Sequence, residues 1–294
     1  MQFIKLLRVK HWIKNTFLFI PLFFSGGFFD FSKYPLLILG FISYSLMASC
    51  IYILNDIRDV ESDRIHPEKR NRPIASGAIS KRNAIILMVI IGLIGISLAI
   101  FIKTKFLFVL CIYLLLNILY SSGLKKIAIL DIIIVAIGFN IRVKAGGVIA
   151  EIAISEWLMV MVFLLSLFIV IAKRRDDTLI KEKTGVDMRK VSSKYNESFL
   201  NVSIAMLASI IIVSYLIYTL SPAVVDRFET HRLYYNSIFV IAGILRYLQI
   251  SFVENDSGSP TKLLYKDRFI QVCILLWLGS FYFLIYIPDF NIFG

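Results

Sequence analysis

Charged residues are scarce in this chain. They make up 18% of its 294 residues, against about 25% in an average soluble domain. Hydrophobic residues make up 58%, against roughly 45–50%. This composition excludes an ordinary soluble domain and is typical of an integral membrane protein. The chain has only three cysteines, each isolated within an apolar run. Their number and spacing argue against a disulfide framework or a cysteine metal site.

Acidic residues are fewer than basic ones, 20 against 32, which gives a net charge of +12. A nucleic-acid-binding protein could show such an excess, but here the charge lies in a few loops, so we expect no nucleic-acid partner. No small-residue cleavage site follows the basic start, and we expect no cleavable signal peptide. A glycine-rich phosphate loop, a Ser-His-Asp set and a Cys-His set are all missing from the sequence.

Long apolar runs dominate the rest of the chain. A helix needs about 20 apolar residues to cross the hydrocarbon core, and runs this continuous are helical in lipid. The sequence predicts an all-α, multi-pass protein in the lipid bilayer, with residues 1–294 forming a single domain, a bundle around a central cavity. Nine spans are predicted, with eight as the alternative because three are short. The nine are 16–29, 35–54, 84–102, 106–120, 129–149, 157–172, 199–220, 236–250 and 269–287.

The placement of lysine and arginine predicts the orientation of these spans. With nine spans, 24 of the 32 basic residues fall in the N-terminal segment and the loops on its side, and five fall on the other side. We therefore expect the N-terminus and the charged loops in the cytoplasm of a cell with the protein in its plasma membrane. The C-terminus is expected outside.

The densest charge lies between two apolar runs, in NDIRDVESDRIHPEKRNRPIASG at residues 55–77. If the preceding helix continues into this stretch, four oxygen-bearing side chains share one side of it: Asn55, Asp56, Asp59 and Asp63. Such a set suits a hard cation, Mg²⁺ or alternatively Mn²⁺, which bridges to a diphosphate. The basic residues Lys69, Arg70 and Arg72 can add phosphate contacts. The alternative interpretation is a solvated loop of mixed charge.

The pattern N-D-x-x-D-x-x-x-D after the second span resembles the UbiA superfamily of intramembrane prenyltransferases. Two further stretches, VKHWIKN and YSSGLKKIAILDIIIVAIGFNIRVKAGG, are similar to the decaprenyl-phosphate phosphoribosyltransferase branch. The resemblance implies transfer of 5-phosphoribose from phosphoribosyl diphosphate to a polyprenyl phosphate, with release of diphosphate. The product would be a precursor for cell-envelope glycans.

One feature departs from the aromatic prenyltransferases of the superfamily, which carry a second aspartate-rich motif after the fourth span. This chain has two lysines there, Lys125 and Lys126, and a single acid, Asp131. A phosphoribosyl transfer brings together a diphosphate, a 5-phosphate and a lipid phosphate, so it needs additional cations. Arg142 lies in a predicted span, where an ionisable side chain usually faces a cavity or a partner. For Asp131, a structural role and a catalytic role stay open.

The resemblance also implies roles for single residues. Mg²⁺ would be held chiefly by Asn55 and Asp59, with Asp63 as the third predicted metal ligand. Asp56 and Asp63 would each either bind the metal or contact a residue that does. Phosphoribosyl diphosphate would be positioned by Lys14, Tyr52, Lys69 and Lys125. The 5-phosphate or the lipid phosphate would be bound by Arg142, Lys173 and Arg174. The remaining candidate substrate-binding residues are Arg72, Tyr120, Lys126 and Asp131.

Two other functions compete with this interpretation. An aromatic prenyltransferase using a polyprenyl diphosphate is disfavoured because the second aspartate cluster is missing. A non-enzymatic transporter would show inverted repeats or helices interrupted by Gly or Pro at matching positions. The sequence shows neither.

The charge bias gives a prediction about topology. Reporters fused after Arg72 and after Lys183 should report the cytoplasm, because both follow strongly basic segments. A C-terminal fusion should report the outside. Paired reporters that are active on opposite sides of the membrane measure this, and a cytoplasmic C-terminus would require an even number of spans.

Overall fold

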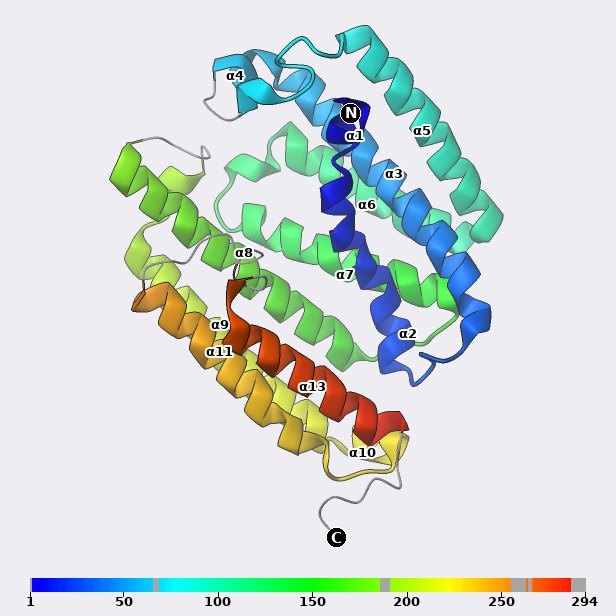
Figure 1. The fold of residues 1–294 in the computed structure, drawn as a ribbon, viewed down its shortest axis with the longest axis vertical. Coiled ribbons are helices and arrows are strands. Elements are labelled where there is room, and N and C mark those ends of the chain that lie inside the picture. The colour runs from blue at the N-terminus through cyan, green and yellow to red at the C-terminus, as the bar shows by residue number, and fades with distance from the viewer. Residues whose placement is uncertain (1, 66–68, 186–190, 255–262, 264–265, 287–294) are drawn as a thin grey trace. The chain divides into compact units, whose positions relative to one another are not determined.

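A computed structural model describes residues 2–65, 69–185, 191–254, 263 and 266–286 of the chain. Every regular element in these ranges is a helix, which confirms the predicted all-α class (Figure 1). The chain forms two compact units, and each is described by itself. Unit 1 comprises Met1–Lys125 and Ile137–Ser155, and unit 2 comprises Lys126–Ala136 and Glu156–Gly294.

Unit 1 is organised around the helix α3 (Tyr34–Arg58), which packs against α5 (Lys81–Ile102) along much of its length (Figure 1). Small residues allow the two helices to approach closely: the Ser43 hydroxyl donates to the Gly95 carbonyl at 2.7 Å. The other helices of this unit are α1 (Gln2–Leu7), η1 (Val9–Phe19), α2 (Ile20–Phe24), η2 (Phe31–Lys33), α4 (Val60–Ile65), η3 (Lys69–Asn71), α6 (Thr104–Ser122) and the later part of α7 (Leu130–Ala150).

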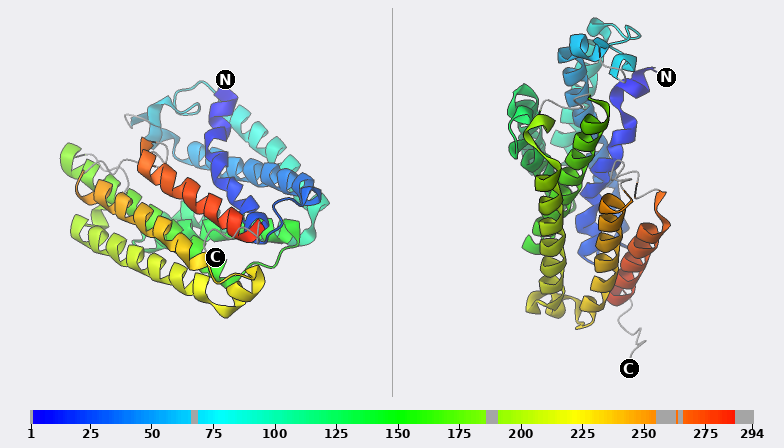
Figure 2. Two further views of the ribbon diagram at one scale, coloured as in Figure 1. Left: turned by 60° about the horizontal axis from the view of Figure 1, so that its bottom comes forward. Right: turned by 90° about the vertical axis from the view of Figure 1, so that its left-hand side faces the viewer.

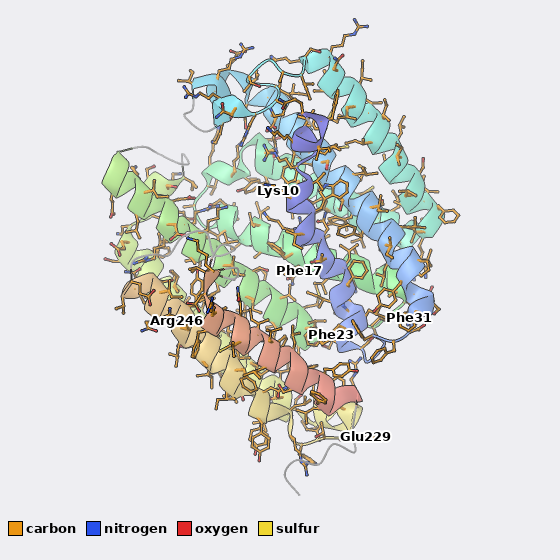
Figure 3. All side chains as sticks on the ribbon, viewed as in Figure 1. Lys10, Phe17, Phe23, Phe31, Glu229 and Arg246 are labelled. Carbon is orange, nitrogen blue, oxygen red and sulfur yellow. The ribbon has the colours of Figure 1, made fainter. Side chains whose placement is uncertain are left out.

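The first predicted span, 16–29, is not one α-helix. Residues Val9–Phe19 form the 3₁₀-helix η1 and Ile20–Phe24 form the short α2, after which the chain turns at Gly26 with φ +82°. Pro21 lies in the first turn of α2, a position that suits a residue without an N–H. Phe17 and Phe23, labelled in Figure 3, lie along these two elements, and the Phe17 ring contacts Phe139 at 4.9 Å. Eleven residues of 3₁₀-helix is unusually long.

Unit 2 consists of helices that pack pairwise: α8 (Glu156–Thr184) packs with α9 (Glu197–Leu220), and α11 (Ser237–Phe252) packs with both α9 and α13 (Arg268–Tyr286) (Figure 2). Arg246 on α11, labelled in Figure 3, donates from Nη2 to Asp267 at 2.8 Å, immediately before α13. That hydrogen bond lowers the pKa of Asp267. The elements are η4 (Leu124–Lys126, ending in this unit), the start of α7, α8 (Glu156–Thr184), η5 (Ser192–Lys194), α9 (Glu197–Leu220), α10 (Pro222–Phe228), η6 (Leu233–Asn236), α11 (Ser237–Phe252) and α13 (Arg268–Tyr286).

The number of membrane spans differs from the prediction. Seven helices in the described residues are long and apolar enough to cross a membrane, and an eighth apolar stretch, Arg268–Leu284, is shorter. Eight of the predicted spans therefore coincide with α-helices, while 16–29 does not. The protein is a multi-pass membrane protein, but the count of nine is not confirmed.

The closest backbone approach in unit 1 gives a prediction about stability. A Cβ added to Gly146 on α7 would lie 1.9 Å from the carbonyl oxygen of Leu18 in η1, and backbone moves only at a cost. Gly146→Ala should therefore destabilise the protein by about 1–3 kcal/mol, the usual cost of overpacking. Thermal unfolding in detergent measures this.

The matched control is Gly279→Ala in α13, where an added Cβ meets nothing within 4 Å. Alanine favours helix over glycine, so this variant should unfold at the wild-type temperature or slightly above it. Equal unfolding temperatures for the two variants would contradict the packing of η1 on α7.

Candidate active site

The end of α3 carries the predicted acidic motif, but the helix does not continue through it. It ends at Arg58, Asp59 adopts φ −92° and ψ 6°, and α4 begins at Val60. The Asp59 N–H still donates to the Asn55 carbonyl at 2.9 Å. The prediction of one uninterrupted helix over residues 55–63 is thus wrong at Asp59. The Asp63 N–H in turn donates to the Asp59 carbonyl at 2.8 Å, so Asn55, Asp59 and Asp63 keep helical spacing across the bend.

Asp56 and Asp63 are both held by arginines. The Asp56 carboxylate is 2% exposed, and its Oδ1 accepts from Arg8 at 2.5 Å and from Arg72 at 3.1 Å. Arg72 Nη1 also donates to Asp63 Oδ2 at 2.7 Å, so one guanidinium joins two buried carboxylates. Arg72, predicted to contact phosphate, is an ion-pair partner here. The role of Asp63 as a metal ligand stays a prediction.

Asn55 and Asp59 lie outside this ion-pair network, and their side-chain oxygens are the candidate metal ligands. The Asp59 side chain is 41% exposed, and the Lys125 ammonium lies 3.6 Å from its Oδ2. The structure thus brings Lys125 of the lysine loop next to the first charged stretch. Within the described ranges no three His, Cys, Asp or Glu residues are grouped closely enough to hold a metal alone. An amide oxygen and a carboxylate nevertheless fit Mg²⁺, which keeps waters and takes substrate phosphate oxygens.

Arg142 is buried in unit 1, with 6% exposure. Its Nε donates to Asn15 at 2.9 Å, Nη1 to the Gly138 carbonyl at 2.8 Å and Nη2 to the Tyr113 hydroxyl at 3.2 Å. Among the interactions described for it, no acid is a partner, and the rings of Tyr44 and Tyr113 lie 5.6 and 5.1 Å from the guanidinium. Neutral dipoles and aromatic faces therefore stabilise this charge. Its proposed contact with phosphate stays a prediction.

Asp131 and Arg174 form a buried ion pair in unit 2. Arg174 Nε donates to Asp131 Oδ2 at 2.7 Å, and both side chains are at most 2% exposed. The Tyr195 hydroxyl donates to the other carboxylate oxygen at 2.6 Å, and Arg174 Nη1 approaches Asp177 at 3.4 Å. Of the two roles left open for Asp131, this geometry favours the structural one. Arg174, predicted to bind phosphate, directs its Nε and Nη1 at carboxylates.

The other candidate residues are spread over several elements. Tyr52 on α3 is half-buried, with the Arg8 guanidinium 4.9 Å from its ring and His11 at 5.4 Å. Lys14 in η1, Lys69 at the start of η3 and Tyr120 near the end of α6 are half-buried. The exposed ones are Lys126 and Lys173. The structure brings Tyr52 near the Arg8–Asp56 pair.

The sequence does not reveal the partners of the charged residues. Arg8 stands directly before the VKHWIKN stretch and Asn15 ends it, but nothing in the sequence marks either as the partner of a distant charge. Tyr113 and Tyr195 lie in ordinary apolar or loop sequence, where nothing marks a tyrosine as the partner of a distant charge. These pairs join residues 29 to 127 positions apart, so only the fold reveals them.

Known proteins offer a comparison for this sequence and its helical fold. The sequence model of the UbiA prenyltransferase family matches residues 16–272. The chain belongs to the UbiA prenyltransferase family. The family match includes the end of α3 with Asp59, the lysine loop and the Asp131–Arg174 pair.

Relatives and solved structures extend the comparison. The chain is 33% identical to a decaprenyl-phosphate phosphoribosyltransferase of Mycolicibacterium smegmatis, over 94% of this chain and 90% of that protein. It is also 33% identical to one of Corynebacterium glutamicum, over 97% and 86%. A UbiA homolog from Archaeoglobus fulgidus, solved with GPP and Mg²⁺, is 19% identical with a TM-score of 0.68, covering 97% of this chain and 99% of that chain. At that identity the likeness concerns the fold.

The two aspartates at the end of α3 should differ in their effect on stability. Asp56→Asn removes the buried carboxylate that both Arg8 and Arg72 contact, and losing hydrogen bonds between charged groups costs about 1–3 kcal/mol. Its unfolding temperature in detergent should fall. Asp59→Asn changes a side chain that is 41% exposed, so its unfolding temperature should stay near that of wild type. The reverse order would contradict the assignment of Asp56 to the ion-pair network.

Proposed function

We propose that the chain transfers 5-phosphoribose from 5-phospho-α-D-ribose 1-diphosphate to a polyprenyl phosphate and releases diphosphate. The observation that carries this proposal is the similarity to decaprenyl-phosphate phosphoribosyltransferases over nearly the whole chain. The position of Lys125, whose ammonium lies 3.6 Å from Asp59 Oδ2, also supports it. An aromatic prenyltransferase would use a second acidic cluster where this chain has Lys125.

The reaction breaks the bond between C1 of the ribose and the diphosphate oxygen, and diphosphate leaves with the electron pair. A new bond forms between C1 and an oxygen of the lipid phosphate. This nucleophile is already anionic, so no strong general base is required. Charge on the leaving group is therefore the main obstacle, and cations near it favour its departure.

Asn55 and Asp59 would hold Mg²⁺, with Mn²⁺ as an alternative, and this metal would neutralise the leaving diphosphate when bound. Lys125, 3.6 Å from Asp59, is placed to contact the same phosphates. The Arg8–Asp56–Arg72–Asp63 network fixes the backbone on either side of Asp59 without itself needing the metal. Tyr52, Lys14 and Lys69 complete the proposed site for phosphoribosyl diphosphate.

We place this activity at the cytoplasmic side of the plasma membrane, because phosphoribosyl diphosphate is a soluble, highly charged substrate and the charged loops share one predicted side. The family match covers residues of both units, which supports one functional domain over 1–294. The lipid product would be a polyprenyl-phosphoryl ribose for cell-envelope glycan synthesis.

The test incubates the purified full chain with radiolabelled phosphoribosyl diphosphate, decaprenyl phosphate and Mg²⁺. Label should move into the lipid fraction, and EDTA should abolish the transfer. Asp59→Ala should lower turnover by on the order of a hundredfold or more, since metal contacts supply several kcal/mol in such reactions. Its unfolding temperature should stay near wild type.

The matched control is Glu61→Ala, which removes a 76% exposed carboxylate two residues away whose partner is Arg64. Its turnover should equal that of wild type. Full turnover in EDTA would contradict the metal requirement. If the wild-type protein instead prenylates 4-hydroxybenzoate from a polyprenyl diphosphate and binds no phosphoribosyl diphosphate, only the family assignment survives.

A further inference from the structure

A strained turn precedes α7 in unit 2. Ile129 has φ +69°, the left-handed region that β-branched residues avoid. Its carbonyl accepts from the N–H groups of Ile132 at 3.1 Å and Ile133 at 3.0 Å, and so starts the helix. Residues held in such conformations persist only where surrounding contacts impose them, and they gather at functional sites.

The contact that holds this turn is the hydroxyl of Tyr195. It accepts from the Ile129 N–H at 2.7 Å and donates to Asp131 at 2.6 Å. Burial and the hydrogen bond to Asp131 raise the pKa of Tyr195 to about 12, so the hydroxyl keeps its proton at neutral pH. One oxygen thereby bridges the backbone before α7 and the carboxylate within its first turn.

The far side of the same carboxylate is also fixed. Arg174 on α8 donates to its second oxygen at 2.7 Å, so three separate segments meet at Asp131. Such a network is costly to assemble for stability alone, because an ion pair this deeply buried often contributes little net free energy. Lys126, an exposed cation of the lysine loop, stands three residues before Ile129.

We propose that Tyr195 is a positioning residue for phosphoribosyl transfer: its hydroxyl imposes the left-handed turn at Ile129 and so directs Lys126 towards a substrate phosphate. This inference rests on the proposed function. Tyr195 itself contacts neither substrate. It acts through the turn, and its contribution depends on the presence of Lys126.

The experiment is a double-mutant cycle on the full chain with phosphoribosyl diphosphate and decaprenyl phosphate. Tyr195→Phe removes only the hydroxyl, and Lys126→Gln removes the cation. Each should lower kcat/KM by about tenfold, mainly through KM for one substrate, as expected for the loss of a hydrogen bond or a charge contact. The double variant should lose about tenfold and not about a hundredfold, because residues acting through one another are not additive.

Glycine supplies a rescue. Ile129→Gly adopts positive φ without strain, so it should restore most of the kcat/KM of Tyr195→Phe. The matched control is Tyr218→Phe on α9, which removes a hydroxyl from the same unit and should leave kcat/KM unchanged. If Tyr195→Phe does not fold, Ile129→Gly is compared with Ile129→Gly/Tyr195→Phe, and near-equal activity is expected.

Losses that multiply in the double variant, or a lack of rescue by Ile129→Gly, would overturn the positioning role and leave Tyr195 as a purely structural residue. A tenfold difference between the two glycine variants would overturn it as well. These outcomes require an active wild type. A wild type that transfers no phosphoribose would overturn the proposed function, and the positioning role with it.

Discussion

The cost of placing charge inside an apolar chain is the constraint on which this structure depends. A carboxylate removed from water is tolerated only with a charged, hydrogen-bonded partner. Each unit contains such a carboxylate: Asp56 with 2% exposure, and Asp131 with none. Arginine is the partner in both cases, and its planar fork can serve several acceptors at once. Arg72 uses this to join Asp56 to Asp63.

The same constraint separates two kinds of residue within one sequence motif. Asp56 and Asp59 are both acidic members of NDIRD, yet one is buried against two guanidiniums and the other is half-exposed beside Lys125. The difference follows from their positions: Asp56 lies within α3 and faces Arg8 and Arg72, whereas Asp59 lies directly after the last residue of the helix. A carboxylate whose charge is already compensated by arginines attracts a metal cation only weakly. The motif therefore combines a structural anchor with a candidate metal ligand.

Much of the fold could be predicted from hydropathy, since a long apolar run has few alternatives to a helix. The prediction of a helical span over 16–29 failed because apolarity alone does not distinguish an α-helix from a 3₁₀-helix. The outcome there depends on Pro21, on Gly26 and on the close approach of η1 to Gly146. The candidate site was predictable where oxygen donors follow helical spacing, as with Asn55 and Asp59. Partners such as Arg8 and Tyr195 were not, because their contacts arise from packing between distant segments.

Arg142 shows how a buried cation is stabilised without an acid among its described contacts. Asn15, the Gly138 carbonyl and Tyr113 direct oxygen atoms at its guanidinium, and aromatic faces surround it. Such neutral partners offset desolvation but leave the net positive charge uncancelled. An anionic oxygen brought near this residue would therefore be attracted more strongly than one near Arg174, whose charge two carboxylates already compensate. The two predicted phosphate-binding arginines therefore differ electrostatically. Among their described contacts, carboxylates compensate the positive charge of Arg174, whereas the contacts of Arg142 are neutral.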